Sequence, residues 1–171
     1  MRCKICGEYG PRFLWHGKDG AAWFRCGLCH SDSSSDTWED VGGHYDAKYI
    51  THNLNACKTK EALADTMAYN LDLFDVHGVP VRTFLDVGCN EGCALVGMEK
   101  RGYEVRGFDV NPAAATDSRV SIGPKLKAEM FADQSFGAIM IREVIEHIPD
   151  WRDALVQAVK LLAVGGLLQV Q

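Results

Sequence analysis

One stretch decides the fold of this 171-residue chain: Phe84-Leu85-Asp86-Val87-Gly88-Cys89-Asn90-Glu91-Gly92. The apolar residues over 83–87 predict a buried strand, and residues 92–101, followed by Gly102, predict a helix. A glycine turn between a strand and a helix lets the backbone approach a ligand closely and directs helix N–H groups toward an anion. We therefore expect a ligand site at this turn.

Strands and helices alternate on both sides of the turn. Apolar residues recur at helical spacing through residues 58–77, which predicts a leading helix. After the turn we expect strands at 103–109, 136–142 and 167–171, and a helix at 150–163. Such alternation predicts an α/β fold, a doubly wound and mostly parallel sheet with helices on both faces.

An acidic residue ends the strand that follows the turn. Asp109 comes 17 residues after Gly92, where a carboxylate can accept hydrogen bonds from both hydroxyls of a ribose. The dinucleotide pattern G-x-G-x-x-G is not met. The glycine turn and the acid, in this order and spacing, favour an adenosine-containing cofactor.

Four segments resemble the motifs of class I S-adenosylmethionine-dependent methyltransferases, in the order of that family. They are residues 84–92, 107–111, 136–150 and 161–168. The resemblance covers residues 80–171 and implies a Rossmann-like methyltransferase domain. Together with the cysteine-rich segment that precedes it, the chain is similar to methyltransferases that act on sugars, glycans and small natural products.

The resemblance implies roles for the residues of the turn. Gly88, Cys89 and Gly92 would pack against the methionine part of S-adenosylmethionine. Asp86 would orient the ammonium group of the cofactor, directly or through water.

It also implies where the adenosine part would lie. Asp109 would hold the ribose, and Val110 would flank the adenine. Asn90 stands where the family usually has glycine, and asparagine readily accepts left-handed dihedral angles, so we expect the turn to persist with this side chain near the cofactor. No clear acidic residue ends a third strand before Phe136, so the usual contact to the adenine amino group has no assigned residue.

A Glu-x-x-Glu-His cluster follows the strand at 136–142. If Glu143, Glu146 and His147 share one helical turn, they lie on one face at the carboxyl end of the sheet. Three interpretations stay open. The turn is structural; or His147 with Glu146 acts as a general base or orients a hydroxyl; or the three residues bind Mg²⁺. The cluster resembles that of small-RNA 2′-O-methyltransferases and of ubiquinone-biosynthesis O-methyltransferases.

The first 30 residues carry two Cys-x2-Cys pairs, Cys3 with Cys6 and Cys26 with Cys29. Nineteen residues separate the pairs, which is typical of a four-cysteine zinc site. Each pair can direct two thiolates at one point, and together they complete a tetrahedron around structural zinc. We expect a zinc ribbon over residues 1–30.

Two alternatives accompany the zinc ribbon. A redox dithiol is one, although a redox pair would normally be single and would lie on a βαβ unit. His16 and His30 are alternative ligands, but four cysteines already fill the coordination shell. Short strands at 12–15 and 22–25, joined by a turn at Lys18-Asp19-Gly20, complete the expected hairpin.

Residues 31–44 are polar and rich in glycine, and we expect a linker over 31–57, followed by the methyltransferase domain over 58–171. Three aromatic residues stand out in it: Trp38, Tyr45 and Tyr49. They either hold the linker against a neighbouring domain or line a substrate entrance.

Composition excludes several classes of protein. The chain has 18 Lys and Arg against 23 Asp and Glu, and residues 1–40 hold five basic and six acidic side chains, so neither the chain nor the ribbon has the basic face that nucleic-acid binding needs. Apolar residues make up 47%, which disfavours intrinsic disorder. No membrane-spanning run or secretory signal is visible, so we expect no membrane association and a cytoplasmic protein.

The leading hypothesis is an S-adenosylmethionine-dependent methyltransferase that acts on a small-molecule or glycan acceptor. The alternatives are an RNA-directed 2′-O-methyltransferase with a metal at the Glu-x-x-Glu-His cluster, and a non-catalytic, zinc-dependent interaction module. The resemblance implies two further strands after the fifth. We therefore expect residues 80–171 to be an incomplete catalytic domain with an exposed sheet edge.

Overall fold

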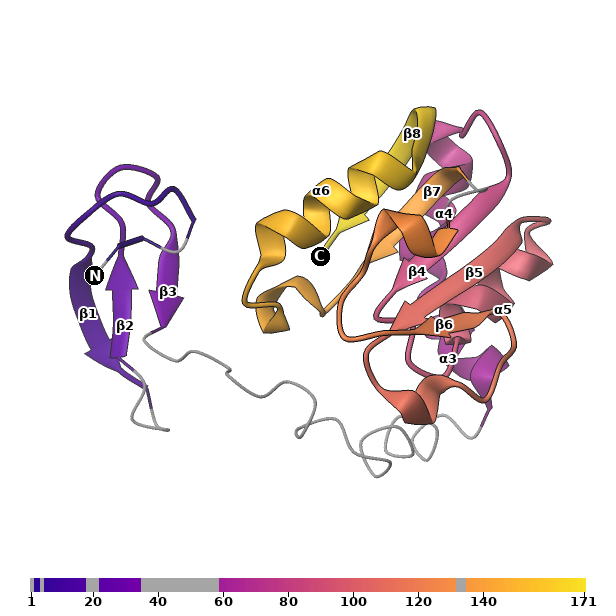
Figure 1. Ribbon diagram of the computed structural model, residues 1–171, viewed down its shortest axis with the longest axis horizontal. Helices are drawn as coiled ribbons and strands as arrows, with labels where there is room; N and C mark the ends of the chain where they lie inside the picture. The colour runs from indigo at the N-terminus through magenta and orange to yellow at the C-terminus, as the bar shows by residue number, and fades with distance from the viewer. Residues whose placement is uncertain (1, 4, 18–21, 35–58, 132–134) are drawn as a thin grey trace. The chain divides into compact units, whose positions relative to one another are not determined.

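The computed structural model describes residues 2–3, 5–17, 22–34, 59–131 and 135–171. The chain divides into two compact units, Met1–Glu39 and Asp40–Gln171. Figure 1 shows that each unit has a sheet of its own, with three strands in the first and five in the second. Within these described ranges, no helix is long and apolar enough to cross a membrane.

The first unit is an antiparallel sheet in the order β1-β2-β3. Its strands are β1 (Arg12–His16), β2 (Ala22–Arg25) and β3 (Asp32–Ser34). The hairpin expected from β1 and β2 is confirmed, with Trp15 opposite Trp23 and their rings stacked at 5.8 Å. The turn expected at residues 18–20 lies outside the described residues.

Strand β3 occupies part of the segment expected to be linker. It pairs with β2, and the guanidinium of Arg25 donates two hydrogen bonds of 2.7 Å to the carboxylate of Asp32. A three-residue polar strand carries almost no local sequence signal, since its pairing with β2 provides its structure. Trp38, Tyr45 and Tyr49 lie outside the described residues.

The second unit is built on a parallel sheet in the order β6-β5-β4-β7-β8. Its strands are β4 (Thr83–Val87), β5 (Glu104–Asp109), β6 (Val120–Ile122), β7 (Phe136–Ile141) and β8 (Leu162–Val170). The expected α/β, Rossmann-like fold is confirmed.

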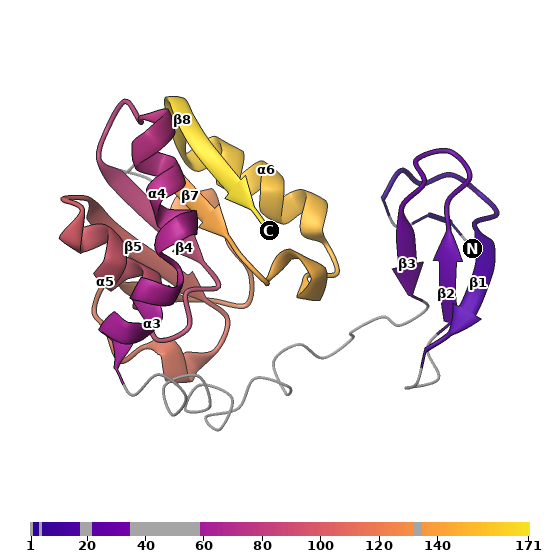
Figure 2. The same ribbon diagram turned by 180° about the vertical axis from the view of Figure 1, so that it is seen from behind.

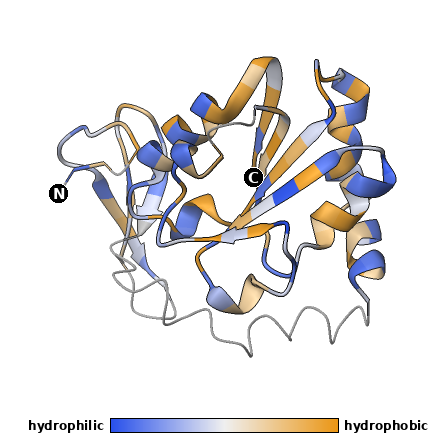
Figure 3. Ribbon diagram, turned by 45° about the vertical axis from the view of Figure 1, so that its right-hand side comes forward, coloured by the Kyte–Doolittle hydropathy of each residue, from blue (hydrophilic) through white to orange (hydrophobic). Residues whose placement is uncertain are grey.

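Helices cover both faces of this sheet. They are α3 (Lys60–Thr66), α4 (Ala68–His77), α5 (Cys93–Lys100) and α6 (Trp151–Leu161), with short 3-10 turns η1 (Pro112–Ala114), η2 (Ala128–Phe131) and η3 (Ile145–His147). Figures 1 and 2, which view opposite sides, place α3, α4 and α5 on one face and α6 on the other. The helices in Figure 3 carry both polar and apolar residues.

Two apolar clusters follow from the alternation of side chains along the strands. Phe84 faces Leu71 of α4 and Leu95 of α5 in the first cluster. The next residue, Leu85, faces Leu161 of α6 in the second. All five of these side chains are at most 3% exposed. The strands are therefore buried on both sides, which explains their nearly continuous apolar sequence.

The segment 58–77 was expected to be one leading helix. It contains two helices instead, because the helical backbone is interrupted at Met67. Thr59 caps α3 by accepting a hydrogen bond of 3.0 Å from the N–H of Ala62. At the other end, the hydroxyl of Thr66 donates to the carbonyl of Leu63 at 2.7 Å. Such side-chain bonding to the previous turn competes with the helix ladder and bends helices.

Two strands differ from expectation. β6 at 120–122 was not foreseen, because three residues are too few to show a period. β8 begins at Leu162, directly after α6, and not at Leu167. Its pairing with β7 is irregular between Phe136 and Ala138, and Gly165 within it has a φ of 78°.

Candidate functional site

The register of the sheet brings three loops together at its carboxyl edge. Val87 at the end of β4 pairs with Phe108 of β5 on one side and with Ile141 of β7 on the other. Parallel strands that end in register deliver the segments after them to one place, which is where open α/β sheets bind ligands.

A cavity of about 530 Å³ lies at this edge. It is lined by six of the seven residues expected to bind the cofactor and by both residues expected to act in catalysis: Asp86, Gly88, Cys89, Asn90, Asp109, Val110, Glu146 and His147. The seventh, Gly92, does not line the cavity. It begins α5 as the N-cap residue with a φ of 78°.

The carboxylate of Asp109 is fixed from both sides. Its Oδ2 accepts a hydrogen bond of 2.8 Å from the N–H of Asn90, and its Oδ1 accepts one of 2.8 Å from the N–H of Asn111. The side chain is 8% exposed. Because each carboxylate oxygen has further lone pairs, Asp109 can still accept hydrogen bonds from two hydroxyl groups of a ligand.

The turn between β4 and α5 has a left-handed backbone at three positions. The φ angles are 80° at Gly88, 49° at Asn90 and 78° at Gly92. A Cβ at Gly88 would overlap a γ-methyl group of Val144, so both the φ angle and the packing require glycine there. Asn90 keeps the turn as expected for an asparagine.

The residues that line the cavity include three buried acids and two cations, Arg142 and Lys125, of which Lys125 is paired with Asp153. Asp86, Glu91 and Asp109 are 5%, 4% and 8% exposed. Burial, with the neighbouring charge of Asp109, raises the pKa of Asp86 to about 7, and Arg142 opposes this increase. Burial also raises the pKa of Glu91, opposed by the charge of Lys60. This excess of acid suits a ligand that carries positive charge.

Sequence reasoning missed two of these residues, Glu91 and Arg142. Both oxygens of Glu91, and Nε of Arg142, are buried without a hydrogen-bond partner among the described residues. The sequence offered one signal for each residue. Glu91 is a charged residue in the glycine turn after a buried strand, and Arg142 is a charged residue directly after another buried strand. Their burial could not be read from it.

The condition that Glu143, Glu146 and His147 share one helical turn is not met, because only Glu146 and His147 lie in η3. Glu143 precedes η3, has a φ of 52° and donates its backbone N–H to the carbonyl of Gln171 at 2.9 Å. Glu146 and His147 lie in η3, and Nε2 of His147 is 3.7 Å from Oε1 of Glu146. The three residues line the cavity but are not gathered around one point.

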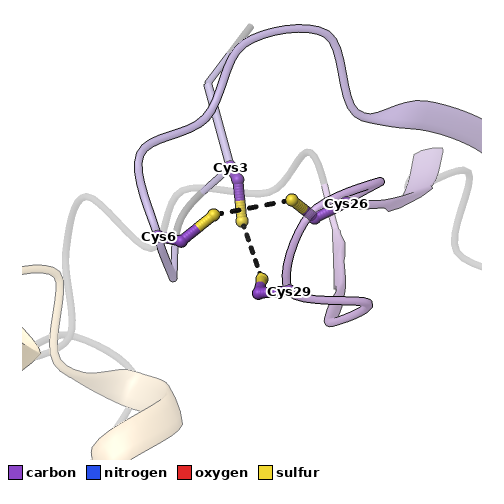
Figure 4. Close-up of side chains that lie close together, drawn as sticks. All are labelled: Cys3, Cys6, Cys26 and Cys29. Atoms are coloured by element: carbon purple, nitrogen blue, oxygen red, sulfur yellow. Dashed lines mark hydrogen bonds between the residues drawn. The ribbon is translucent and has the colours of Figure 1, made fainter.

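The four cysteines of the first unit converge, as Figure 4 shows. All four sulfur atoms lie within 4.8 Å of one another, with Cys3 and Cys29 3.7 Å apart and Cys6 and Cys26 3.5 Å apart. A tetrahedron with Zn–S bonds of 2.3 Å has edges of about 3.8 Å, so this arrangement fits zinc. Across the part of the chain that the structure describes, no other group of three or more metal-ligating side chains gathers in this way.

Known proteins match this second unit in sequence. A family model described as a methyltransferase domain matches residues 43–171. A ubiquinone biosynthesis O-methyltransferase of Alkalilimnicola ehrlichii is 34% identical over 100 residues, which are 52% of this chain and 40% of that protein. Its counterpart in Aliivibrio fischeri is 29% identical over 108 residues, which are 57% of this chain and 46% of that protein. The match thus spans less than half the length of these curated relatives.

Solved structures share the fold of this chain. The plantazolicin methyltransferase BpumL, in complex with a substrate analogue and S-adenosylhomocysteine, has a TM-score of 0.53 at 16% identity, over 75% of this chain and 53% of that chain. CalS10, an amino pentose methyltransferase from Micromonospora echinaspora bound to S-adenosylmethionine, has a TM-score of 0.53 at 21% identity. The match covers 74% of this chain and 57% of that chain. At these identities the likeness shows the fold.

Proposed function

The chain belongs to the methyltransferase-domain family, and on that premise we propose that it binds S-adenosylmethionine and transfers the methyl group to a small-molecule or glycan acceptor. The observation that carries this proposal is the Asp109 carboxylate. Two backbone N–H groups hold it on the wall of a cavity that His147 also lines. A fixed acceptor of this kind suits the two hydroxyls of a ribose.

The charges of the wall suit this cofactor. S-adenosylmethionine carries an ammonium, a sulfonium and a carboxylate, so its net charge is positive. The three buried acids of the wall outnumber its cations Arg142 and Lys125, and Lys125 is already paired with Asp153, so a cationic ligand would relieve the excess of acid. Asp86 would orient the ammonium, and Val110, after Asp109, would flank the adenine.

The class of acceptor rests on the relatives and on charge. One relative is named for ubiquinone biosynthesis and one fold neighbour for an amino pentose, so small molecules and sugars are the acceptors in those proteins. The ribbon segment, residues 1–40, has five basic and six acidic side chains. Without a clustered basic face, counterion release would contribute little to the binding of RNA.

His147 is our candidate for acting on the acceptor. When bound, S-adenosylmethionine supplies a methyl group that its sulfonium already activates, which leaves alignment and proton removal to the protein. His147, with the carboxylate of Glu146 at 3.7 Å, would orient an acceptor hydroxyl or remove its proton.

We also propose structural zinc at the four cysteines. Their sulfur separations match a closed tetrahedral site, which leaves no open position for catalysis. The first unit is too small to bury a self-sufficient core, so the metal would contribute much of its folding free energy.

Calorimetry with S-adenosylhomocysteine tests the proposed cofactor site. We expect Asp109→Ala to weaken binding by about 30-fold or more, because two charge-assisted hydrogen bonds to the ribose are lost. Asn90→Gly should weaken binding by less than about threefold, because the backbone N–H that holds Asp109 remains and glycine accepts a φ of 49°.

His147→Ala provides the matched control in the same experiment. The side chain is assigned to the acceptor, so its removal should leave the affinity for S-adenosylhomocysteine unchanged within about twofold. No heat of binding from folded wild-type protein at high concentration would contradict the proposed function. A larger loss for Asn90→Gly than for Asp109→Ala would contradict the assignment of the site.

A further inference from the structure

The two Cys-x2-Cys loops of the first unit have matching backbone hydrogen bonds. The N–H of Cys3 donates to the carbonyl of Glu8 at 2.7 Å, and the N–H of Cys26 donates to the carbonyl of Ser31 at 3.0 Å. In each loop the N–H two residues after the first cysteine also donates to the sulfur of that cysteine at 3.4 Å. Glu8 and Ser31 therefore occupy equivalent places, each two residues after the second cysteine of its loop.

The side chains at these two places differ. Glu8 is exposed, whereas Ser31 is half-buried. The Oγ atom of Ser31 lies 3.0 Å from the sulfur of Cys29 and 3.6 Å from the sulfur of Cys3. These sulfur atoms come from different loops and are 3.7 Å apart. The hydroxyl of Ser31 thus lies beside an edge of the sulfur tetrahedron that joins the two loops, the edge between Cys3 and Cys29 in Figure 4.

Zinc would fix the direction of the hydrogen bond made by Ser31. A cysteine bound to zinc is a thiolate and has no hydrogen to donate, so the hydroxyl of Ser31 must be the donor. Four thiolates and one Zn²⁺ carry a net charge of about −2, so a donor beside a sulfur atom makes a charge-assisted hydrogen bond. Such partners orient metal ligands and raise the affinity for the metal.

We propose that Ser31 is a positioning residue of the zinc site, an inference that rests on the structural zinc proposed above. Its hydroxyl donates to the thiolate of Cys29, next to that of Cys3, and so stabilises the ligands of both loops at the edge where they meet. It is not a ligand itself, because four cysteines fill the coordination shell.

The full chain with Ser31→Thr or Ser31→Val tests the hydroxyl, because threonine and valine have nearly the same shape. Zinc affinity is measured by competition with a chromophoric chelator. Ser31→Val should bind zinc about tenfold or more weakly than Ser31→Thr, the usual effect of losing such a partner. Ser31→Thr should stay within about threefold of the wild type. Ser33→Val makes the same change on β3, opposite Phe24, and should stay within about twofold of the wild type.

Replacement of zinc by Co²⁺ adds a readout that altered packing alone would not move. A hydrogen bond lowers the energy of the sulfur lone pairs, so its loss should shift the sulfur-to-cobalt charge-transfer absorption to longer wavelength in Ser31→Val. The absorption of Ser31→Thr should match that of the wild type. The cobalt d–d bands should stay tetrahedral in all variants, which shows that the four cysteines still bind the metal.

Three results would overturn the inference. One is an equal zinc affinity of Ser31→Val and Ser31→Thr. Another is an equal loss in Ser33→Val, which would make the effect a general one of β-branched substitution. The third is a weaker affinity of Ser31→Val with an unshifted charge-transfer absorption, which would reduce Ser31 to packing. Wild-type protein that binds neither zinc nor Co²⁺ would instead contradict the proposed zinc site.

Discussion

At the scale of single residues, Asp86 makes the stability of the fold depend on pH. It is 5% exposed on β4, and burial, with the charge of Asp109, raises its pKa from the ordinary value of 3.8 to about 7. Between these two values the folded state retains a proton that the unfolded state has lost. Stability therefore falls as the pH rises from about 4 to about 7, since the unfolded state binds fewer protons.

Asp86→Asn should remove this dependence in the ligand-free protein. The neutral amide replaces a carboxylate whose ionisation is unfavourable, so the variant should gain stability over the wild type as the pH rises. The difference between a pKa of 3.8 and one of about 7 corresponds to about 4 kcal/mol at pH 8. Urea unfolding from pH 5 to pH 8 measures the gain.

The exposed acid Asp65 of α3 is the control for that measurement. Asp65→Asn should follow the wild-type pH dependence. Equal stability of Asp86→Asn and the wild type at pH 8 would show that ionisation of Asp86 is not costly in the fold.

At the scale of elements, the site depends on contact between the turn after β4 and the segment after β7. Gly88→Ala places a methyl group against Val144 and also strains a φ of 80°. Gly102→Ala has the same φ of 80° but no atom within 4 Å of the new methyl group. Urea unfolding should show Gly88→Ala less stable than Gly102→Ala by about 1–3 kcal/mol, the usual cost of overpacking.

A double-mutant cycle separates packing from backbone strain. Val144→Ala should recover part of the loss caused by Gly88→Ala, because it removes the methyl group that the new Cβ overlaps. It should recover nothing from Gly102→Ala. Additive effects of Gly88→Ala and Val144→Ala would show that the two elements do not share this contact.

At the scale of the whole molecule, the chain is two compact units, and each contains one of the two proposed sites. All the residues that line the cavity belong to the second unit, between Leu63 and Ala154. The four cysteines belong to the first. A substitution that abolishes zinc binding at the proposed zinc site should therefore leave binding at the proposed cofactor site unchanged.

Cysteine substitution tests this independence on the full chain. Elemental analysis should find one zinc per wild-type chain and a loss of zinc in Cys26→Ser, because that thiolate completes the tetrahedron. The affinity of Cys26→Ser for S-adenosylhomocysteine should remain within about twofold of the wild type. A wild type that is monodisperse but free of zinc would contradict the metal site, and a joint loss of zinc and affinity would contradict its independence.

Local patterns in the sequence were enough for much of the fold and for part of the site. The apolar run before Gly88 and the acid at Asp109 predict a strand, a turn and a ligand contact, because side-chain periodicity and left-handed turns depend on neighbouring residues. The Cys-x2-Cys spacing predicts convergent thiolates for the same reason. Strand β6 at 120–122 and the break at Met67 were missed, since tertiary pairing and one threonine side chain decide them.

The sequence by itself predicted most of the candidate site residues that line the cavity, and the tertiary structure decided how they are placed and charged. Sheet register brings Asp86 and Asp109 to the same cavity as His147, although up to 61 residues separate them in the chain. The burial of Glu91 and the raised pKa of Asp86 arise because segments distant in sequence pack around these acids and exclude water from them. Desolvation is a property of packing, which no local pattern encodes.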